Sequence, residues 1–333
     1  MRVIFICENP STFFTVFNKQ ILDDLKKICD TDEVVYKKAD ILKTSDRFSD
    51  AKVIFSTWGM PGFTEDEIKS IFPQLECVFY AAGSVQHFAR PFLNCGIKVF
   101  SAWAANAVPV AEYTVSQIIL AGKGFFALSR LMAQKQPDDI NRQKGAYIGN
   151  YRTKVGLIGC GMIGSLVANM LKAYDLEVLA FDPFLSDESA QEIGVKKCTL
   201  EEIFSTCFVV SNHLANNEKT RRIFNYKLFS TMPEYSTFIN TGRGAQVVED
   251  DLVKILIERP DITALLDVTD PEPAPLSHPF YSLPNCFLTP HIAGSIGHEV
   301  SRMAEYMVNE FRNFSNGLPY NYEVTLKMLE TMA

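Results

Sequence analysis

Four ionisable side chains stand at or near the ends of apolar segments in the second half of this chain. Arg243 follows STFIN and lies between two glycines, Asp267 ends ITALLD, and His291 follows CFLTP. Glu272 lies in a proline-framed loop shortly after Asp267. Histidine changes its charge close to neutral pH, so His291 is a candidate proton carrier if it has partners. Taken singly, each of the four could be a loop charge, a turn residue or a packed ring.

A glycine-rich turn precedes them, in the segment VGLIGCGMIGSLVANML. Gly159, Gly161 and Gly164 form G-x-G-x-x-G between a predicted strand and an amphipathic helix, which lets the backbone approach a pyrophosphate at a helix N-terminus. The next predicted strand, LEVLAF, ends at Asp182, where a carboxylate would bind ribose hydroxyls and repel a 2′-phosphate. No Arg or Lys follows in DPFLSDESA. The pattern predicts NAD rather than NADP, although Asp182 could instead cap a turn before Pro183.

Short apolar runs alternate with amphipathic segments along most of the chain. This alternation predicts an α/β protein with parallel sheets covered by helices on both faces. We expect helices at 13–28, at 109–133 with Pro109 in the first turn, and at 296–314, and a polar stretch at 134–151. The expected strands are 2–7, 52–56, 76–80, 97–100, 154–159, 176–181, 207–212, 236–240, 262–268 and 286–289.

In a parallel sheet all carboxyl ends lie along one edge, where ligands bind. Arg243, Asp267, Glu272 and His291 should therefore converge on the crevice that receives a nicotinamide. The length of 333 residues favours two domains, and a break near 104–108 separates two α/β units. The last helix could return to the first unit.

The overall composition excludes several classes of protein. A net charge of −7 argues against a nucleic-acid partner. The eight cysteines form no CxxC pair and no cluster with zinc spacing, so we expect no metal and a reducing compartment. The apolar run at the N-terminus is too short for a signal peptide, and no segment has the roughly 18 apolar residues of a membrane helix. We therefore expect a cytoplasmic protein without a membrane partner.

The motifs GLIGCGMIG with Asp182, INTGRG, LDVTDPEP and TPHIAG occur in this order, and NAVPVAEYT occupies 106–114. In this set the chain resembles the D-isomer-specific 2-hydroxyacid dehydrogenase family. The resemblance implies a Rossmann-like coenzyme domain at 105–296, inserted into a discontinuous, flavodoxin-like substrate domain at 1–104 and 297–333. It also implies a homodimer joined mainly through the coenzyme domains, and hydride transfer between NAD and a small 2-oxo or D-2-hydroxy acid.

The resemblance also implies a role for each ionisable residue. His291 would protonate the carbonyl oxygen as hydride arrives, and Glu272 would orient the ring and favour its protonated form. Arg243 would hold the carboxylate of the substrate, and Asp267 the carboxamide of the nicotinamide. The predicted cofactor-binding residues are Gly159, Gly161, Met162, Ile163, Gly164, Asp182, His213, Thr241, Gly242, Asp267 and Gly294.

The chain departs from the family pattern in the substrate domain. Relatives commonly read G-x-G-x-D-x-x-D after the strand at 76–80, whereas residues 83–88 here read GSVQHF. Backbone N–H groups at 83–84 could still bind a carboxylate, and His87 either lines the pocket or packs. Ala215 stands where a proline often follows His213. The predicted substrate residues are Trp58, Gly59, Met60, Gly83, Ser84 and Arg243, although Trp58 and Met60 could belong to the core.

These features predict an NAD-dependent D-2-hydroxyacid dehydrogenase, with a substrate of the glyoxylate or hydroxypyruvate type. One alternative is D-3-phosphoglycerate dehydrogenase, against which the 56–62 loop has no base for a phosphate. Formate dehydrogenases share the scaffold but carry glutamine where Glu272 stands. An alternative of another class is an NAD-sensing corepressor that keeps the site and acts through protein contacts.

Overall fold

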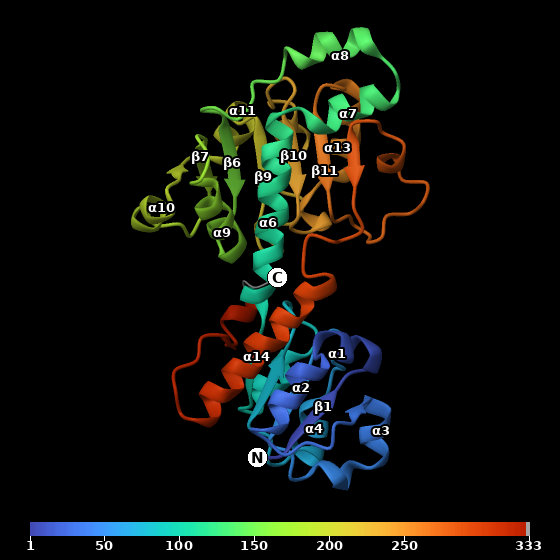
Figure 1. Cartoon of the computed structure of the whole chain (residues 1–333), viewed down its shortest axis with the longest axis vertical. Coiled ribbons are helices and arrows are strands. Elements are labelled where there is room, and N and C mark those ends of the chain that lie inside the picture. The colour runs from blue at the N-terminus through green and yellow to red at the C-terminus, as the bar shows by residue number, and fades with distance from the viewer. Residues whose placement is uncertain (331–333) are drawn as a thin grey trace. The chain divides into compact units, whose positions relative to one another are not determined.

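Residues 1–330 are described by the structure, a computed structural model (Figure 1). The chain divides into two compact units. The first, here called the terminal unit, comprises Met1–Asn106 and the described chain from Ser295 onward; the second, the central unit, is Ala107–Gly294. These boundaries lie two residues from the predicted ones. No helix in the described part of the chain is both long enough and apolar enough to cross a membrane.

The terminal unit contains a six-stranded sheet with the order β13-β5-β4-β3-β1-β2. Only β13 is antiparallel to its neighbour, and the other five strands have the flavodoxin-like order. Its strands are β1 (Val3–Ile6), β2 (Val35–Tyr36), β3 (Val53–Ser56), β4 (Cys77–Tyr80), β5 (Lys98–Ser101) and β13 (Glu323–Val324).

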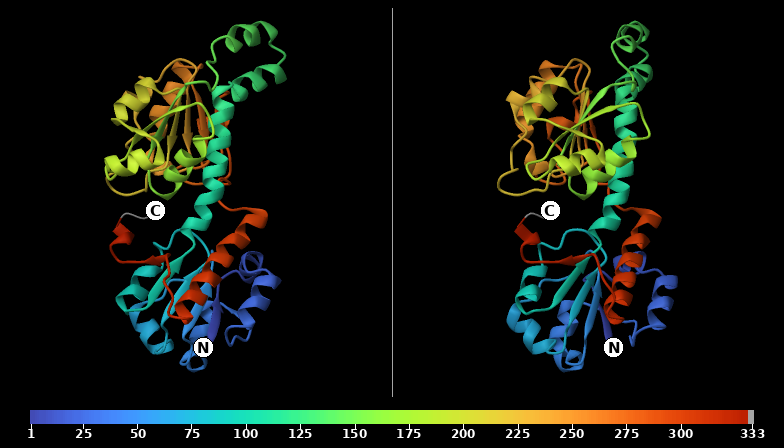
Figure 2. Two further views of the ribbon diagram at one scale, coloured as in Figure 1. Left: turned by 60° about the vertical axis from the view of Figure 1, so that its left-hand side comes forward. Right: turned by 90° about the vertical axis from the view of Figure 1, so that its left-hand side faces the viewer.

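Helices cover both faces of this sheet, which explains why its strands are continuous apolar runs. Phe5, Phe55 and Phe79 point to one face, and the last two meet Phe311 of the C-terminal helix at ring distances of 5.5 and 5.6 Å. That helix lies beside the N-terminal helices in both views of Figure 2. One face carries α1 (Pro10–Val16), α2 (Lys19–Lys26) and α14 (Val300–Ser315), and the other α3 (Lys38–Lys43), α4 (Glu65–Ile71) and α5 (Ala89–Asn94).

The central unit is a Rossmann fold with a seven-stranded parallel sheet in the order β12-β11-β10-β9-β6-β7-β8. The order in which strands are added reverses between β6 and β9, and open parallel sheets bind ligands at such a point. The strands are β6 (Lys154–Ile158), β7 (Glu177–Phe181), β8 (Lys196–Lys197), β9 (Val209–Asn212), β10 (Thr237–Asn240), β11 (Thr263–Leu266) and β12 (Cys286–Leu288).

Helices pack on both faces of this sheet as well, and α6 crosses one of them in Figure 1. That face carries α6 (Trp103–Gly122), α9 (Met162–Leu171) and α10 (Asp187–Ile193), and the other carries α11 (Leu200–Thr206), α12 (Tyr226–Phe229) and α13 (Glu249–Glu258). The predicted α/β class with two parallel sheets is confirmed.

Two predicted helices were wrong in their extent. The segment 13–28 is interrupted after Val16, because the Asn18 side chain accepts a hydrogen bond from Ile21 N at 3.2 Å and starts a new helix. Helix α6 begins at Trp103, so Pro109 lies inside it rather than in its first turn. The alanine-rich residues 103–108 are good helix formers and extend the helix backwards past the proline.

The second half of that predicted helix is a separate helix, and the polar stretch contains another. Gly124, with a left-handed φ of +67°, separates α6 from α7 (Phe125–Ala133). Helix α8 (Pro137–Lys144) lies within 134–151. Strands β2, β8 and β13 were not predicted, since two residues show no periodicity.

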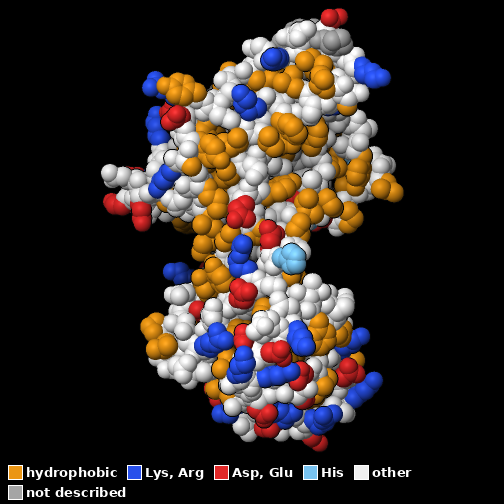
Figure 3. Space-filling model, viewed as in Figure 1, with side chains coloured by type: hydrophobic (Ala, Val, Ile, Leu, Met, Phe, Trp, Pro, Cys, Tyr) orange, Lys and Arg blue, Asp and Glu red, His pale blue; other side chains and the backbone are white. Residues whose placement is uncertain are grey.

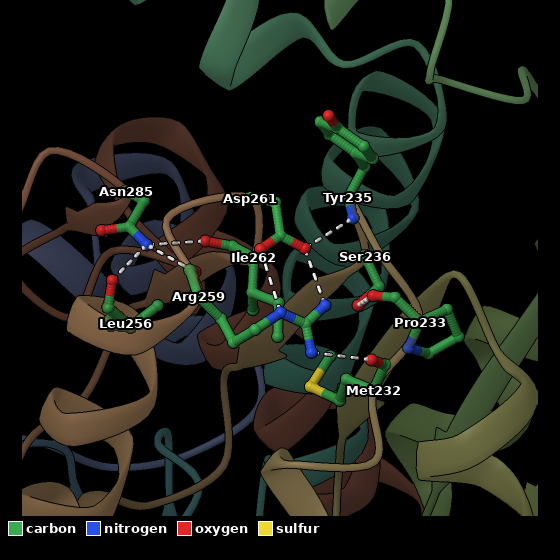
Figure 4. Close-up of polar contacts among 9 residues, drawn as sticks. All are labelled: Met232, Pro233, Tyr235, Ser236, Leu256, Arg259, Asp261, Ile262 and Asn285. Atoms are coloured by element: carbon green, nitrogen blue, oxygen red, sulfur yellow. Dashed lines mark hydrogen bonds and ion pairs between the residues drawn. The ribbon is translucent and has the colours of Figure 1, made fainter.

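The amino ends of β10, β11 and β12 are held by a polar cluster at the edge opposite the carboxyl ends (Figure 4). Arg259 pairs with Asp261 through two hydrogen bonds of 3.0 and 2.7 Å, and Asp261 accepts a third from Tyr235 N. Asn285 donates to the carbonyl oxygens of Leu256 and Ile262 at 3.0 and 2.8 Å. This edge is stabilised by its own contacts, and the carboxyl edge carries the candidate site.

Candidate active site

The glycine-rich turn joins β6 to α9 at the carboxyl edge of the central sheet. Gly159 has a φ of +94°, and a Cβ on it would lie 2.7 Å from the carbonyl carbon of His213. A Cβ on Gly164 would lie 2.0 Å from Gly159 O, so helix and turn are in direct contact. In front of Gly161, by contrast, a Cβ would meet no heavy atom of the described chain within 4 Å. Of the three glycines of the motif, only Gly161 therefore has a backbone that a ligand could approach.

Helix α9 directs its first N–H groups toward this opening. Met162 and Ile163 are its first two residues, and Gly161 at the N-cap has no side chain with which to cap them. The positive end of the helix dipole and these N–H groups suit a pyrophosphate. The turn thus fits the diphosphate of a dinucleotide.

Asp182 stands beside this turn at the end of β7. Its Oδ2 accepts a hydrogen bond from Cys160 N at 2.7 Å, and its Oδ1 accepts one from Phe184 N at 2.8 Å. The second contact is the turn cap that was the alternative explanation for this residue. Both can hold, since each carboxylate oxygen keeps a further lone pair for a ribose hydroxyl.

His213 closes the other side of the glycine turn, after β9. Burial lowers the pKa of His213 to about 4, so the ring is neutral at physiological pH. Its Nε2 lies 3.0 Å from Ser211 Oγ, and its Nδ1 has no partner among the described residues. A neutral ring is compatible with a cofactor at this position.

Three buried amide side chains connect the loops that follow β9 and β10. Asn212 Nδ2 donates to Asn240 Oδ1 at 2.9 Å and to Gln246 Oε1 at 2.8 Å. Gln246 Nε2 in turn donates to Leu214 O and Ala215 O at 3.1 and 3.3 Å. This amide network was not predicted, because polar residues at strand ends are common. It fixes the loop at Ala215, where a proline would have been expected to do so.

The same network supports the loop that carries Arg243. Asn240 Oδ1 accepts from Gly242 N at 3.1 Å, and Gln246 Oε1 accepts from Arg243 N at 3.1 Å. The adjacent Thr241 is buried. Burial lowers the pKa of Arg243, and the charge of Glu272 opposes this shift. The guanidinium donates to Gly242 O at 2.8 Å, which leaves most of its N–H groups for another acceptor.

Asp267 is 3% exposed and organises the loop that follows β12. Its Oδ1 accepts hydrogen bonds from Thr289 Oγ1 at 2.6 Å and Ile292 N at 2.9 Å, and its Oδ2 accepts one from Ala293 N at 2.8 Å. Its carbonyl oxygen accepts from His291 N at 3.0 Å. His291 has a φ of +53°, a left-handed backbone conformation that residues other than glycine rarely adopt. Asp267 thus holds His291 in place, a task that was not predicted, while its contact with a carboxamide stays a prediction.

His291 and Glu272 face each other at the surface of the central unit. His291 Nδ1 lies 2.5 Å from Glu272 Oε1, and both side chains are exposed. A carboxylate at Nδ1 stabilises a proton on that nitrogen and leaves Nε2 to exchange a proton with a ligand. The structure therefore brings His291 and Glu272 into contact. Arg243 is close enough for the charge of Glu272 to raise its pKa.

The remaining predicted residues lie in loops of the terminal unit, apart from Gly294, the last residue of the central unit. Trp58 is 39% exposed, whereas Met60 is 2% exposed and belongs to the core. Gly59 has a φ of +99° and packs against Cys7, whose thiol donates to Trp58 O at 3.2 Å. The Met60 side chain therefore packs in the core, as the alternative explanation for this residue had it.

The second loop of the terminal unit is joined to the first. Ser101 Oγ donates to Gly83 O at 2.6 Å, and Gly83 and Ser84 are half-buried. His87 is exposed, its Nε2 lies 3.1 Å from Met60 O, and its ring meets the edge of Phe88. His87 thus connects the two loops rather than packing in the core.

Comparison with known proteins places this geometry in a family. Residues 115–293 match the family model described as D-isomer specific 2-hydroxyacid dehydrogenase, NAD binding domain. The chain belongs to the D-isomer specific 2-hydroxyacid dehydrogenase family. The match covers every predicted cofactor-binding and catalytic residue from Gly159 to His291. This chain therefore contains the NAD-binding domain of the family, and the predicted cofactor, NAD, is confirmed.

Relatives in this family carry different names. The chain is 31% identical over 274 residues to a formate dehydrogenase of Chaetomium thermophilum, covering 79% of this chain and 74% of that one. It is 28% identical over 235 residues to the D-3-phosphoglycerate dehydrogenase of Archaeoglobus fulgidus, covering 71% of this chain and 44% of that one. The chain spans about half the length of several curated relatives, between 43% and 58%.

A solved structure agrees with the fold over nearly all of the chain. The phosphoglycerate oxidoreductase from Rhizobium etli superposes with a TM-score of 0.79 at 20% identity, and the match covers 97% of each chain. At this identity the likeness establishes the fold. The substrate has to be inferred from the residues of the site.

Proposed function

We propose that the protein is an NAD-dependent oxidoreductase that interconverts a small 2-oxo acid and the D-2-hydroxy acid. The observation that carries the proposal is the 2.5 Å contact between His291 Nδ1 and Glu272 Oε1, in a unit that also holds a dinucleotide-binding turn. When bound, the nicotinamide supplies or takes up the hydride. Reduction of a carbonyl also needs a proton donor at the oxygen, and we assign this role to His291 Nε2 because Glu272 contacts the other ring nitrogen.

The other residues of the central unit have supporting tasks in this proposal. Arg243 binds the substrate carboxylate, since a planar guanidinium suits a planar anion. Glu272 orients the His291 ring and stabilises its protonated form. Gly161, the first turn of α9 and Asp182 hold the dinucleotide. Thr241 follows β10 and Asp267 follows β11. Both strands lie between β12, which precedes His291, and β6, which precedes the glycine turn.

The substrate that we favour is a small acid of the glyoxylate or hydroxypyruvate type. The loop at 57–62 carries no basic residue that could bind a phosphate. Lys38 reaches Gly62 O at 2.7 Å, but its charge is paired with Glu67 at 2.8 Å. A formate dehydrogenase would have no use for an acid pair, because formate loses a hydride without gaining a proton at oxygen.

We also propose a homodimer that forms through the central unit. Hydrophobic side chains lie at the surface over α6 and α7 in Figure 3. Leu120 of α6 and Phe125 and Met132 of α7 are exposed. Exposed apolar patches of this kind mark protein interfaces. Sedimentation equilibrium would test the dimer.

We further propose that the protein works in a reducing compartment such as the cytoplasm, because all eight cysteines are free thiols.

The function is tested by NADH oxidation against glyoxylate, hydroxypyruvate, pyruvate, phenylpyruvate and 3-phosphohydroxypyruvate, with NAD reduction by formate measured beside them. We expect turnover with at least one unphosphorylated 2-oxo acid. Preference for 3-phosphohydroxypyruvate would favour a phosphoglycerate dehydrogenase. Binding of NADH without turnover of any acid would favour the corepressor-like function, in which the site acts through protein contacts.

A further inference from the structure

Glu249, the first residue of α13, reaches the loop that carries Glu272. Its Oε1 accepts a hydrogen bond from Asp270 N at 2.9 Å, and its Oε2 lies 3.3 Å from His278 Nε2. Only 12% of the Glu249 side chain and 16% of the His278 side chain is exposed. A single, largely buried carboxylate therefore contacts the loop two residues before Glu272 and again six residues after it.

The orientation of the His278 ring is fixed by its other nitrogen. His278 Nδ1 accepts a hydrogen bond from Phe280 N at 3.3 Å, and the two rings lie 4.4 Å apart. Because Nδ1 accepts this hydrogen bond, Nε2 is the ring nitrogen that carries a proton. Nε2 therefore donates to Glu249, and the ionised carboxylate is the form that satisfies both neighbours.

The loop between these two contacts, residues 270–278, has few backbone N–H groups with which to stabilise its own conformation. Prolines at 271, 273 and 275 have no N–H group, so backbone hydrogen bonds within the loop are scarce. The neighbouring Arg243 loop packs on the same place, since a Cβ on Gly244 would lie 2.0 Å from the Thr269 carbonyl carbon. External anchors therefore decide where Glu272 points.

We propose that Glu249 and His278 are positioning residues for the acid–base pair, because together they hold the 270–278 loop with Glu272 facing His291. This inference rests on the proposed function, in which Glu272 sets the protonation of His291. Neither residue touches the candidate substrate or cofactor. Their effect on the reaction passes through Glu272.

Several ionisable groups act on Glu249. Burial raises its pKa to about 7, the hydrogen bond from Asp270 N opposes this shift, and the charges of Asp270 and Asp250 add to it. Glu249 in turn raises the pKa of the Cys286 thiol, which burial has already raised. With His278, these are the groups around the carboxylate. Below about pH 7 Glu249 takes up a proton and loses an acceptor, so Glu249→Gln imitates the low-pH form at every pH.

The test compares Glu249→Gln and His278→Leu with His278→Gln, which keeps an N–H donor near the position of Nε2. The first two should lower kcat for reduction of a 2-oxo acid by about tenfold and leave the KM for NADH within about twofold, whereas His278→Gln should recover most of the rate. Glu201→Gln, in the exposed first turn of α11, is the matched control. In a Glu272→Gln background the Glu249 substitution should have no further effect. Additive losses would overturn the inference.

A second measurement does not depend on turnover. The His291 ring can be titrated by NMR, with its signal assigned from a His291→Gln variant. In Glu249→Gln, or in His278→Leu if the first variant does not fold, the ring should lose its proton at a lower pH than in the unsubstituted protein. An unchanged titration would overturn this inference alone. Failure of the unsubstituted protein to turn over any 2-oxo acid would instead overturn the proposed function.

Discussion

The two units hold their candidate site loops in different ways. In the central unit, buried side-chain oxygens accept hydrogen bonds from backbone N–H groups of the loops, as Asp267 does from residues 292 and 293 and Gln246 does from Arg243. In the terminal unit, the loops are joined mainly through carbonyl oxygens, as in the contacts of Thr57 with Ala81 O and of His87 with Met60 O. The first arrangement fixes side-chain geometry, and the second fixes only the path of the chain.

This difference matches two different requirements of the proposed reaction. Proton transfer needs a donor within hydrogen-bond reach of one atom, so small displacements are costly. Recognition of a small acid needs a wall of suitable shape, which tolerates changes in side chains. Substitutions in the central unit should therefore lower kcat, and those in the terminal unit should change KM and the choice of substrate.

The largest effect is expected at His291. His291→Ala removes the proton donor and should lower kcat by roughly 10²–10⁴, the usual scale for a lost general acid. NADH should bind as before, because three strands separate β12 from β6 in the sheet. Steady-state kinetics and NADH fluorescence would check both parts. A loss of less than tenfold would mean that another group supplies the proton and that the central unit does not hold the chemistry.

The next effect concerns the cofactor. Asp182 would face the 2′-phosphate of NADPH, and like charges at short range are unfavourable. We expect kcat/KM for NADH to exceed that for NADPH on the order of 10²-fold, a difference of about 2.7 kcal/mol. Asp182→Ala combined with a new arginine nearby should narrow the gap. Comparable values for the two cofactors in the unsubstituted protein would contradict the role of Asp182.

Much of the central unit could be predicted from the sequence, because its candidate site residues belong to short motifs at strand ends. The parallel topology then brings Arg243, Glu272 and His291 to one edge without further information. The contacts that support them could not be predicted. Asp267 bonds to backbone atoms some 25 residues away, and such partners leave no trace in residue types. The loops of the terminal unit were less predictable still, because residues 83–88 depart from the family pattern and their contacts are also made to backbone atoms.

A smaller effect is expected at Glu272. Glutamine keeps a hydrogen bond to His291 but removes the charge that stabilises the protonated ring. The basic limb of the pH–rate profile for reduction should move to lower pH, and a shift of one unit corresponds to about 1.4 kcal/mol, or tenfold at neutral pH. At acidic pH, where the ring is protonated in any case, much of the rate should return. A loss that is equal at every pH would make Glu272 a purely positional residue.

The smallest effect is expected in the terminal unit, at His87. Its ring joins the 57–62 loop to the 83–88 loop through one hydrogen bond to Met60 O, and a single bond of this kind contributes about 0.5–1.5 kcal/mol. His87→Ala should therefore raise the KM for a 2-oxo acid by roughly 2- to 12-fold. It should leave kcat and the KM for NADH nearly unchanged, because neither loop contributes a group to the central unit's acid–base pair. His298→Ala, another exposed histidine of the same unit, is the control and should change neither constant. If His87→Ala instead lowers kcat tenfold at unchanged KM, the terminal unit takes part in the chemistry, and the division between a fixed unit and an adaptable one fails.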